Sequence, residues 1–228
     1  YKRGQGRVNL VCGRFSLHAR AVPTRVAALG LWVLCLAAFQ SLPAAADELP
    51  GGPPARTGSI AVGAETAMII PLSTNRLCPP DYACIADLGW AVDVGFSYRW
   101  ANGIGLGFGY EFWLLTDNGV YETTVPQMFL ALLQYSFLPT RTIHPLVRLR
   151  GGFLILGPSF RLATIGGAAE IGMGAEVELS SDPVFSFVLT GNLLRTQAFT
   201  SRADGAARAV DGALDAFLGL RVGINFLL

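Results

Sequence analysis

Lysine is almost absent from this chain, which has Lys2 and no other, and charged residues make up only 14% of its 228 residues. That share is well under the quarter that is usual for soluble domains. After residue 46 there is also no run of about 18 apolar residues, so the sequence predicts no membrane-spanning helix in that part. Histidine is scarce as well, and His144 is the one histidine beyond residue 46. With so few nitrogen and sulfur ligands, we expect no metal site.

The formal charge of +1 combines two segments of opposite sign. Residues 1–46 contain one Lys, five Arg and no acid, giving +6, whereas the remainder contains 11 Arg and 16 acids, giving −5. Nucleic-acid-binding proteins need a cationic surface, so we expect no nucleic-acid partner. The part after residue 46 also lacks a G-x-S-x-G motif and a phosphate-binding loop, and we therefore expect neither an enzyme nor a cofactor.

The first 46 residues have the composition of a secretory signal. Arg20 and Arg25 precede the apolar stretch VAALGLWVLCLAAF, and small residues stand at Ala44 and Ala46. A basic start, a short apolar stretch and an A-x-A site predict cleavage after Ala46. A membrane anchor and an N-terminal core helix are the alternatives, although 14 apolar residues are few for a span. The expected organisation is a removed signal peptide with an upstream extension (1–46), a short lead (47–56) and a folded domain (57–228).

Export would bring the folded domain into an oxidising compartment. Cys78 and Cys84 enclose the short segment CPPDYAC. A disulfide between them is the expected state, and the alternative is a metal pair. No histidine or further cysteine lies close by in the sequence to complete a metal site.

Residues 89–103, GWAVDVGFSYRWANG, alternate strictly between bulky and small or charged side chains. A period of two predicts a strand with two different faces. The same pattern recurs in eight segments: 58–70, 88–101, 104–115, 125–138, 144–157, 166–180, 184–196 and 213–228. The faces opposite the apolar ones hold small and polar residues together with the charges Glu65, Asp93, Arg99, Glu111, Arg148, Arg150, Glu170, Glu176, Glu178, Asp215 and Arg221. Segment 125–138 is apolar on both faces, so a helix is the alternative there.

Connections between these segments alternate in length. Segments 101–103, 138–143 and 180–183 are short, whereas 71–87, 116–124, 158–165 and 197–212 are longer. This alternation is typical of an all-β, eight-stranded, antiparallel up-and-down transmembrane β-barrel. A soluble lipid-binding barrel is the alternative, and it would place the apolar faces inside.

Trp90 and Trp100 stand ten residues apart on one face of segment 88–101. At about 3.3 Å per residue and a tilt near 40°, they are separated by roughly 25 Å along a barrel axis. Because that distance matches the height of the apolar band of an outer-membrane barrel, we expect an aromatic belt at these two positions.

With its signal, strand count, loop rhythm and final segment ALDAFLGLRVGINFLL, the chain resembles the small eight-stranded outer-membrane barrels of the OmpA membrane-domain and OmpX type. The resemblance implies location in the outer membrane of a Gram-negative-type bacterium, contact with outer-membrane lipid and lipopolysaccharide, and a last strand read by the outer-membrane assembly machinery. It departs from the family in ending on Leu228, where an aromatic residue is usual. It also makes residues 47–56 a periplasmic lead.

Side chains can just fill the interior of an eight-stranded barrel. Around the turn at Asn102, Asp93 should face Glu111, and two facing carboxylates need a compensating charge. Arg148 and Arg150 are expected nearer the periplasmic end, at the height of Glu176 and Glu178. The expected function is that of a plugged barrel with a structural or surface-interaction role, in which loops 71–87 and 197–212 are free to bind a surface ligand. Segment 197–212 is expected to be flexible or briefly helical. A narrow ion- or solute-conducting, porin-like channel is the alternative.

Overall fold

The computed structural model describes residues 58–74, 76–79, 81–116, 123–139, 141–178, 183–210 and 214–228. The expectations for residues 1–46 and 47–56 lie outside these ranges. Among the described residues, none belongs to a helix with the length and hydropathy needed to cross a membrane.

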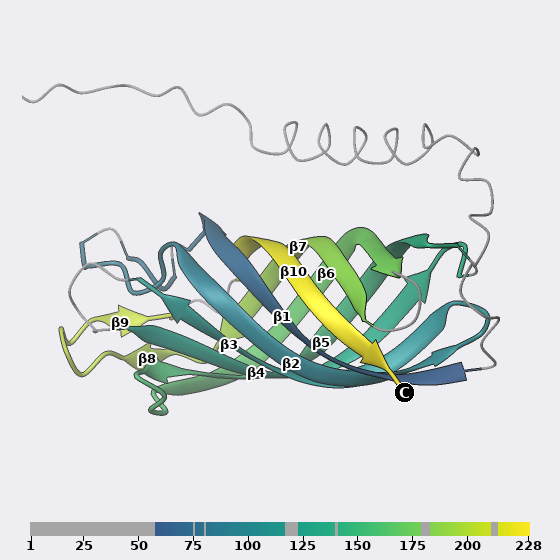
Figure 1. The fold of residues 1–228 in the computed structure, drawn as a ribbon. Coiled ribbons are helices and arrows are strands. Elements are labelled where there is room, and N and C mark those ends of the chain that lie inside the picture. The colour runs from purple at the N-terminus through teal and green to yellow at the C-terminus, as the bar shows by residue number, and fades with distance from the viewer. Residues whose placement is uncertain are drawn as a thin grey trace, which may run out of the picture. The chain divides into compact units, whose positions relative to one another are not determined.

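Eight long strands close into one antiparallel barrel (Figure 1). Every consecutive pair of long strands is hydrogen-bonded, and the first strand pairs with the last, which confirms the predicted all-β, eight-stranded up-and-down fold. The strands are β1 (Gly58–Ser73), β2 (Gly89–Trp100), β3 (Ile104–Leu115), β4 (Thr124–Ser136), β5 (Ile143–Pro158), β6 (Thr164–Glu178), β7 (Val184–Thr196) and β10 (Asp215–Leu227).

The strand predicted at 125–138 is confirmed as β4, and the alternative helix is not observed. One local expectation was wrong. The segment expected to be flexible or briefly helical, 197–212, contains in its described part a small hairpin of β8 (Phe199–Thr200) and β9 (Ala207–Arg208). The loop between β5 and β6 is also shorter than expected, because both strands extend further and leave 159–163 between them.

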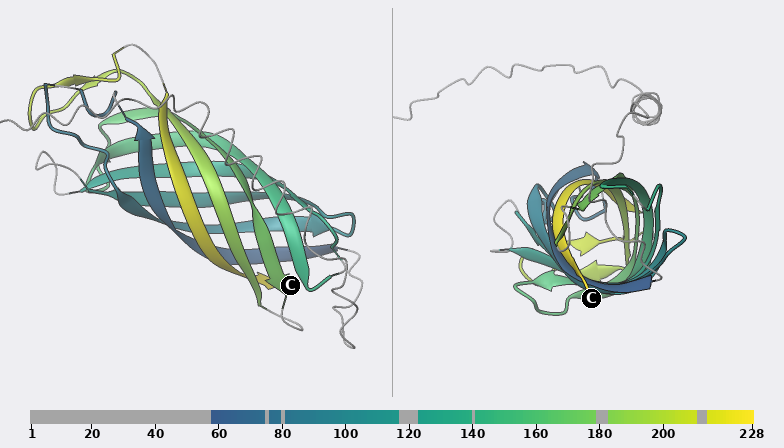
Figure 2. Two further views of the ribbon diagram at one scale, coloured as in Figure 1. Left: turned by 90° about the horizontal axis from the view of Figure 1, so that it is seen from above. Right: turned by 45° about the vertical axis from the view of Figure 1, so that its right-hand side comes forward.

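The two ends of the barrel differ in their connections. Short turns at 101–103 and 137–142 lie at the end that also carries the C-terminus, which we call the turn end. The other end, the loop end, carries β8 and β9 (Figure 1) and the described residues of the remaining connections, which are 74, 76–79, 81–88, 116, 123, 159–163, 197–210 and 214. Figure 2 shows the strands inclined to the barrel axis and, in the second view, the closed ring that they form.

Strand pairing is offset around the barrel. A path of directly paired residues that leaves β1 at Ala61 returns to β1 at Pro71, ten residues further on (71 − 61), by way of Ser97, Gly107, Leu132, Arg150, Glu170, Asn192 and Phe217. An offset of this kind is what closing a sheet into a tilted barrel requires. A line of constant height therefore steps back along each strand by an average of 1.25 residues (10/8).

The line of constant height through Glu65 crosses β5 close to Leu149 and β10 close to Val222. Arg148 and Arg150 therefore lie at mid-height, and the prediction that they lie near the turn end was wrong. The strand has 16 residues, of which these arginines are the sixth and the eighth, so both are central in β5 rather than close to the turn that precedes it.

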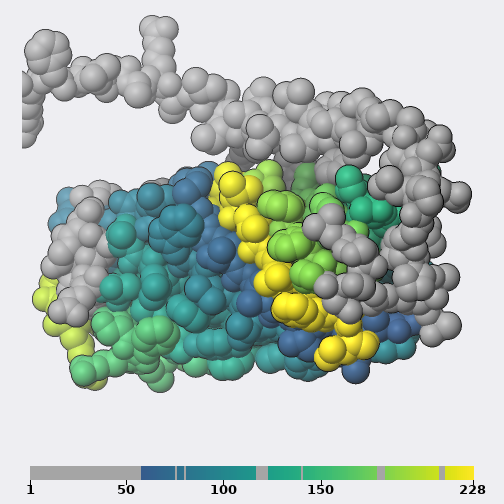
Figure 3. Space-filling view, in the orientation of Figure 1, coloured from purple at the N-terminus to yellow at the C-terminus, as the bar shows by residue number. Residues whose placement is uncertain are grey.

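The two faces of the wall are inverted relative to a soluble barrel. Trp90, Phe108 and Leu220 project outward and are 60%, 44% and 53% exposed, whereas Asp93 and Arg221 face the interior and are buried. The arrangement of apolar faces inside, expected for a soluble lipid-binding barrel, is therefore not observed. The space-filling view shows how closely β10 (yellow) is enclosed between its neighbours (Figure 3).

Candidate functional site

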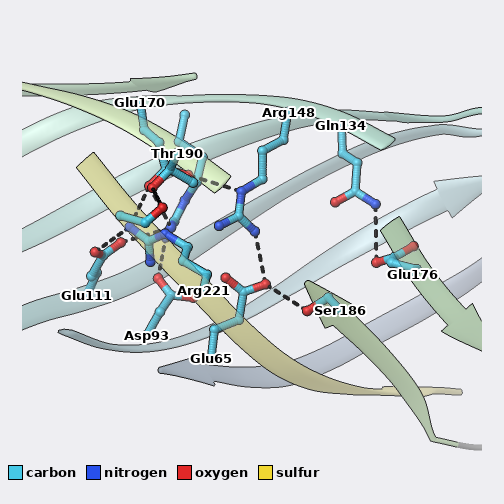
Figure 4. Close-up of polar contacts among 12 residues, drawn as sticks. Glu65, Asp93, Glu111, Gln134, Arg148, Glu170, Glu176, Ser186, Thr190 and Arg221 are labelled. Carbon is cyan, nitrogen blue, oxygen red and sulfur yellow. Dashed lines mark hydrogen bonds and ion pairs between the residues drawn. The ribbon is translucent and has the colours of Figure 1, made fainter. Parts of the chain in front are cut away.

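The barrel interior holds a cluster of ionised side chains at mid-height (Figure 4). Its charged residues come from six of the eight long strands, and Ser186 on β7, which is hydrogen-bonded to Glu65, adds a seventh strand. We call its seven charged residues the central ion cluster. Four are carboxylates and three are guanidinium groups: Glu65, Asp93, Glu111 and Glu170, and Arg148, Arg150 and Arg221. Side chains two residues apart on a strand point to the same face. These residues occupy inward positions of their strands, so all of them reach the barrel interior.

Glu111 lies at the centre of this cluster and is fully buried. Its carboxylate accepts hydrogen bonds from Arg221 at 2.6 Å, from Arg150 at 2.8 Å and from the indole N–H of Trp113. Arg150 also pairs with Asp93, so that one guanidinium compensates both of the facing carboxylates. Asp93 and Glu111 are direct partners across β2 and β3, as the turn geometry predicted.

Arg148 and Arg221 join the rest of the cluster. Arg148 donates to Glu170 at 3.0 Å and to Glu65 at 2.9 Å, while Arg221 donates to Glu170 at 2.5 Å. Ser186 adds a hydrogen bond to Glu65 at 3.2 Å. Buried charges need this degree of pairing, because desolvation otherwise costs several kcal/mol per ion.

Inward glycines make room for these long side chains. A Cβ at Gly109 would lie 3.1 Å from Arg150 Nη2 and 3.2 Å from Asp93 Oδ2, and one at Gly223 would lie 2.6 Å from Glu65 Cγ. Gly109 belongs to the sequence GIGLGFG at 103–109, where glycine recurs at every second residue. The steric demand of the cluster therefore explains glycine at these inward positions.

Two further pairs lie nearer the turn end. Arg99 binds Glu176 in a bidentate pair with both N–O distances at 2.7 Å. His144 Nε2 lies 3.6 Å from Glu178 Oε2, and both side chains are buried. Neither Glu176 nor Glu178 pairs with Arg148 or Arg150, since those arginines lie higher in the barrel and contact other carboxylates.

A polar cavity of about 40 Å³ adjoins the central ion cluster on its turn-end side. Its lining includes Glu65, Asp93, Arg99, Arg148 and Asn225. Glu65 Oε2 and Arg148 Nη2 have no hydrogen-bond partner among the described residues, although both atoms are buried. Each water needs roughly 10–15 Å³ of such space, so the cavity has room for about three.

Toward the loop end the interior becomes apolar. Inward side chains at this level form one packed layer with the residues of loop 74–88, and Trp113 packs edge-to-face on Phe217 with ring centroids 5.1 Å apart. We call this set the apolar layer; it consists of Ala67, Ile69, Leu77, Ile85, Ala86, Ala91, Trp113, Leu115, Met128, Leu130, Leu154, Leu156, Leu194 and Phe217. The expectation that inward faces are polar throughout was therefore wrong in this half. The apolar layer also explains why β4 is apolar on both faces.

Two loops fold together above the apolar layer, and we call segments 74–88 and 197–210 the cap. Arg208 on β9 is completely buried and donates to the carbonyl oxygens of Leu77 at 2.5 Å and Ala83 at 3.0 Å. A third bond joins it to Asp204 at 2.5 Å. One arginine thereby satisfies backbone groups of a different loop, which fixes the two loops to each other.

The predicted disulfide between Cys78 and Cys84 is present and closes a small ring within the cap. Leu77 precedes this ring, while Ile85 and Ala86 follow it, and all three side chains are fully buried in the apolar layer. The ring is therefore anchored on both sides, with Tyr82 left 50% exposed at its surface.

All eleven charges assigned to the interior lie on inward positions of the strands. Seven form the central ion cluster, Arg99 pairs with Glu176, and Glu178 lies beside His144. Asp215 is buried at the loop end of β10, beside the backbone of Arg76 and Leu77. Trp90 and Trp100 both project outward, near opposite ends of β2.

Sequence reasoning missed Trp113, Phe217 and Arg208. Trp113 and Phe217 could have been found, because both are bulky residues on the face that otherwise carries small and charged ones. Arg208 lies in the segment ADGAARAV, which has no periodicity that marks a buried side chain. Only the folded contact between two distant loops shows its role.

No protein-family model matches the chain, and no curated protein matches it either. Among solved structures, the chain is similar to the crystal structure of Neisserial surface protein A (NspA), with a TM-score of 0.53 and 13% sequence identity. The match covers 75% of this chain and 99% of that chain. The predicted resemblance to eight-stranded outer-membrane β-barrels is therefore confirmed at the level of the fold.

Proposed function

We propose that this chain is an integral protein of a bacterial outer membrane, with a sealed interior and a structural or surface-interaction role at its loop end. The inverted wall is the observation that carries the proposal. The outward positions of β1, β2 and β3 are dominated by apolar side chains, whereas the central ion cluster lies inside. In water this arrangement would expose a large apolar surface, which soluble monomers rarely do. In a bilayer, the inward placement of the arginines avoids the free-energy cost of about 2–4 kcal/mol for an arginine that faces lipid at mid-depth.

Two successive barriers support a sealed interior over a narrow channel. The central ion cluster fills the middle of the barrel, and the apolar layer lies between it and the loop end. An ion that passed the cluster would then have to cross a packed layer containing Trp113 and Phe217, both fully buried. Desolvating an ion in such surroundings is prohibitive at ambient temperature.

The cap supports a role in interaction. Loops on a rigid scaffold are common binding surfaces, and this pair is held by the disulfide, by Arg208 and by the apolar layer. Preorganisation lowers the entropy lost when a partner binds. Tyr82 and Val210 remain 50% and 64% exposed on the cap, and a tyrosine on a rigid loop is a favourable anchor for a protein partner.

Membrane insertion is tested by fractionation and gel mobility. The folded chain should require detergent for extraction from outer-membrane fractions and should migrate differently before and after boiling. A water-soluble monomer would refute the proposal. Planar-bilayer recordings should show no repeated conductance steps, and regular steps would instead support the porin-like alternative.

Orientation is tested with two matched cysteine variants. Val210→Cys lies at the loop end and Leu138→Cys at the turn end, where the native side chains are 64% and 53% exposed. A membrane-impermeant maleimide added to intact cells should label V210C and leave L138C unlabelled until the outer membrane is permeabilised. The reverse pattern would contradict an external cap.

A further inference from the structure

Arg195 departs from the rule that charges of the strands face inward. It lies on β7 between the buried residues Leu194 and Thr196, so its side chain projects outward, and it is exposed. Its direct partner on β6 is Gly167, whose lack of a side chain leaves open space beside it. An outward arginine without a neighbouring carboxylate needs an external anion or water in order to be stabilised.

The height of Arg195 places it outside the apolar band. The line of constant height through Glu65 crosses β7 between Val188 and Leu189. Arg195 lies about six residues from this line toward the loop end, whereas Trp90 lies about four residues from it in the same direction. With about 2.5 Å of rise per residue along the axis, Arg195 is roughly 18 Å from the midpoint between Trp90 and Trp100. The hydrocarbon half-thickness is about 12–15 Å. The guanidinium is therefore level with lipid headgroups.

Arg161 is brought to the same rim by backbone contacts. It lies in the short β5–β6 loop and is exposed, and Ala163 N donates to Leu156 O at 2.9 Å, which holds the loop close to the end of β5. Thr164 Oγ1 then donates to Gln197 O at 2.9 Å, two residues beyond Arg195. Arg161, in the β5–β6 loop, and Arg195, on β7, thus lie at the same rim of β5, β6 and β7.

This edge is also free of exposed acids in the described part. Within 123–139, 141–178 and 183–200, the carboxylates are Glu170, Glu176 and Glu178, and all three are buried inside the barrel. The described loop-end acids with exposed side chains, Asp81 and Asp87, lie on the other side, between β1 and β2. Among the described residues, no carboxylate therefore pairs with Arg161 or Arg195, since Asp204, in the loop after β7, is bonded to Arg208.

We propose that Arg161 and Arg195 bind the phosphate groups of a phosphorylated lipid in the outer leaflet, a deeper step that rests on the proposed membrane location. Arginine suits this ligand because its planar donors match phosphate oxygens and its aliphatic stem can lie along the apolar wall. The apolar strand faces below the two arginines, which include Phe153 and Leu193, then contact the acyl chains. The ligand class is an anionic phosphoglycolipid, of which bis-phosphorylated lipid A is the probe.

The test uses the full folded chain in nonionic detergent and a fluorescently labelled lipid A, with binding followed by anisotropy. R161Q/R195Q should weaken binding by about tenfold or more, since each arginine contributes charge-assisted bonds to phosphate. The matched control is Arg141→Gln, which removes an exposed arginine at the turn end and should change binding by less than about twofold. Enzymatically dephosphorylated lipid A should bind the wild type about as weakly as lipid A binds the double variant.

Three results would overturn the site: equal binding of phosphorylated and dephosphorylated lipid, an unchanged affinity in R161Q/R195Q, or an equal loss in R141Q. Competition by inorganic phosphate at millimolar concentration should be slight, because the acyl chains of the lipid also contact the apolar wall. Strong competition would indicate a free-anion site and refute the lipid assignment. Insertion of every variant into vesicles is measured in parallel by gel mobility. A chain that fails to insert refutes the proposed function, whereas an inserted barrel without phosphate preference refutes only this site.

Discussion

Replacement of Arg221 by methionine should strongly destabilise the barrel. Arg221 is 1% exposed and donates to Glu111 at 2.6 Å and Glu170 at 2.5 Å. The central ion cluster contains four carboxylates and three guanidinium groups, so its formal charge is −1, and the variant would make it −2. Removing one partner of a buried ionic network costs about 3–5 kcal/mol, because the remaining charges stay buried without compensation. We expect a loss of this size in the free energy of unfolding.

The assay is reversible urea unfolding of the barrel in lipid vesicles, followed by tryptophan fluorescence and by gel mobility. Arg141→Met is the control, because Arg141 is exposed in a turn, and it should change the free energy by less than about 0.5 kcal/mol. In the double variant R221M/E111Q, neutralising Glu111 should recover part of the loss, with a coupling energy of about 1–3 kcal/mol. A cost below about 1 kcal/mol for R221M, or strict additivity with E111Q, would show that the cluster is not a coupled network.

Three other perturbations test the remaining parts of the interior and the cap. Gly109→Val should displace the Arg150–Asp93 pair, because a Cβ there already lies 3.1 Å from Arg150 Nη2, and should cost about 1–3 kcal/mol in urea unfolding; a neutral effect would mean that the wall yields at this point. Arg208→Met should leave the carbonyl groups of the cap without their donor and speed proteolysis within 74–88 in the folded barrel, whereas unchanged proteolysis would show that the apolar layer alone holds the cap. Burial acts to raise the pKa of the Asp204 carboxyl, but hydrogen bonds from Ala206 N–H and from Ser201, together with the Arg208 charge, lower it overall. A carboxyl group whose pKa is lower in the folded cap than in the unfolded chain stabilises the folded form at pH values above its unfolded pKa. The cap should therefore lose stability as the pH falls below about 4, and Asp204→Asn should remove that pH dependence of proteolysis.

The wall of the barrel could be predicted from sequence because each strand reports its own two faces. In β2 every bulky side chain has an even number, and the same alternation fixes β3 and β10. A slip of one residue would exchange the faces completely, so the apolar positions determine the register of each strand. The pairing of Asp93 with Glu111 followed from one turn, since a tight connection fixes which residues face each other.

Contacts across the barrel could not be predicted in this way. The partner of Arg150 depends on the ten-residue offset around the barrel, which is a property of all eight strands together and of no single one. Arg99 was matched to no carboxylate by its position, yet it binds Glu176, 77 residues away. The role of Arg208 depends on a contact between two loops, and loops carry no periodic signal.

The division of the interior into two halves bears on the sealed interior that we propose. Trp113 belongs to both halves, because its ring packs on Phe217 in the apolar layer while its N–H donates to Glu111 in the central ion cluster. The cluster alone would be a weak barrier, since hydrated ions could exchange with its charged groups from the polar cavity on the turn-end side. The apolar layer excludes water from the other side and lowers the local dielectric, which strengthens each ion pair at its boundary. Under the proposed function the two halves therefore depend on each other: the layer would prevent the cluster from conducting, and the cluster satisfies the polar group that the layer contributes through Trp113.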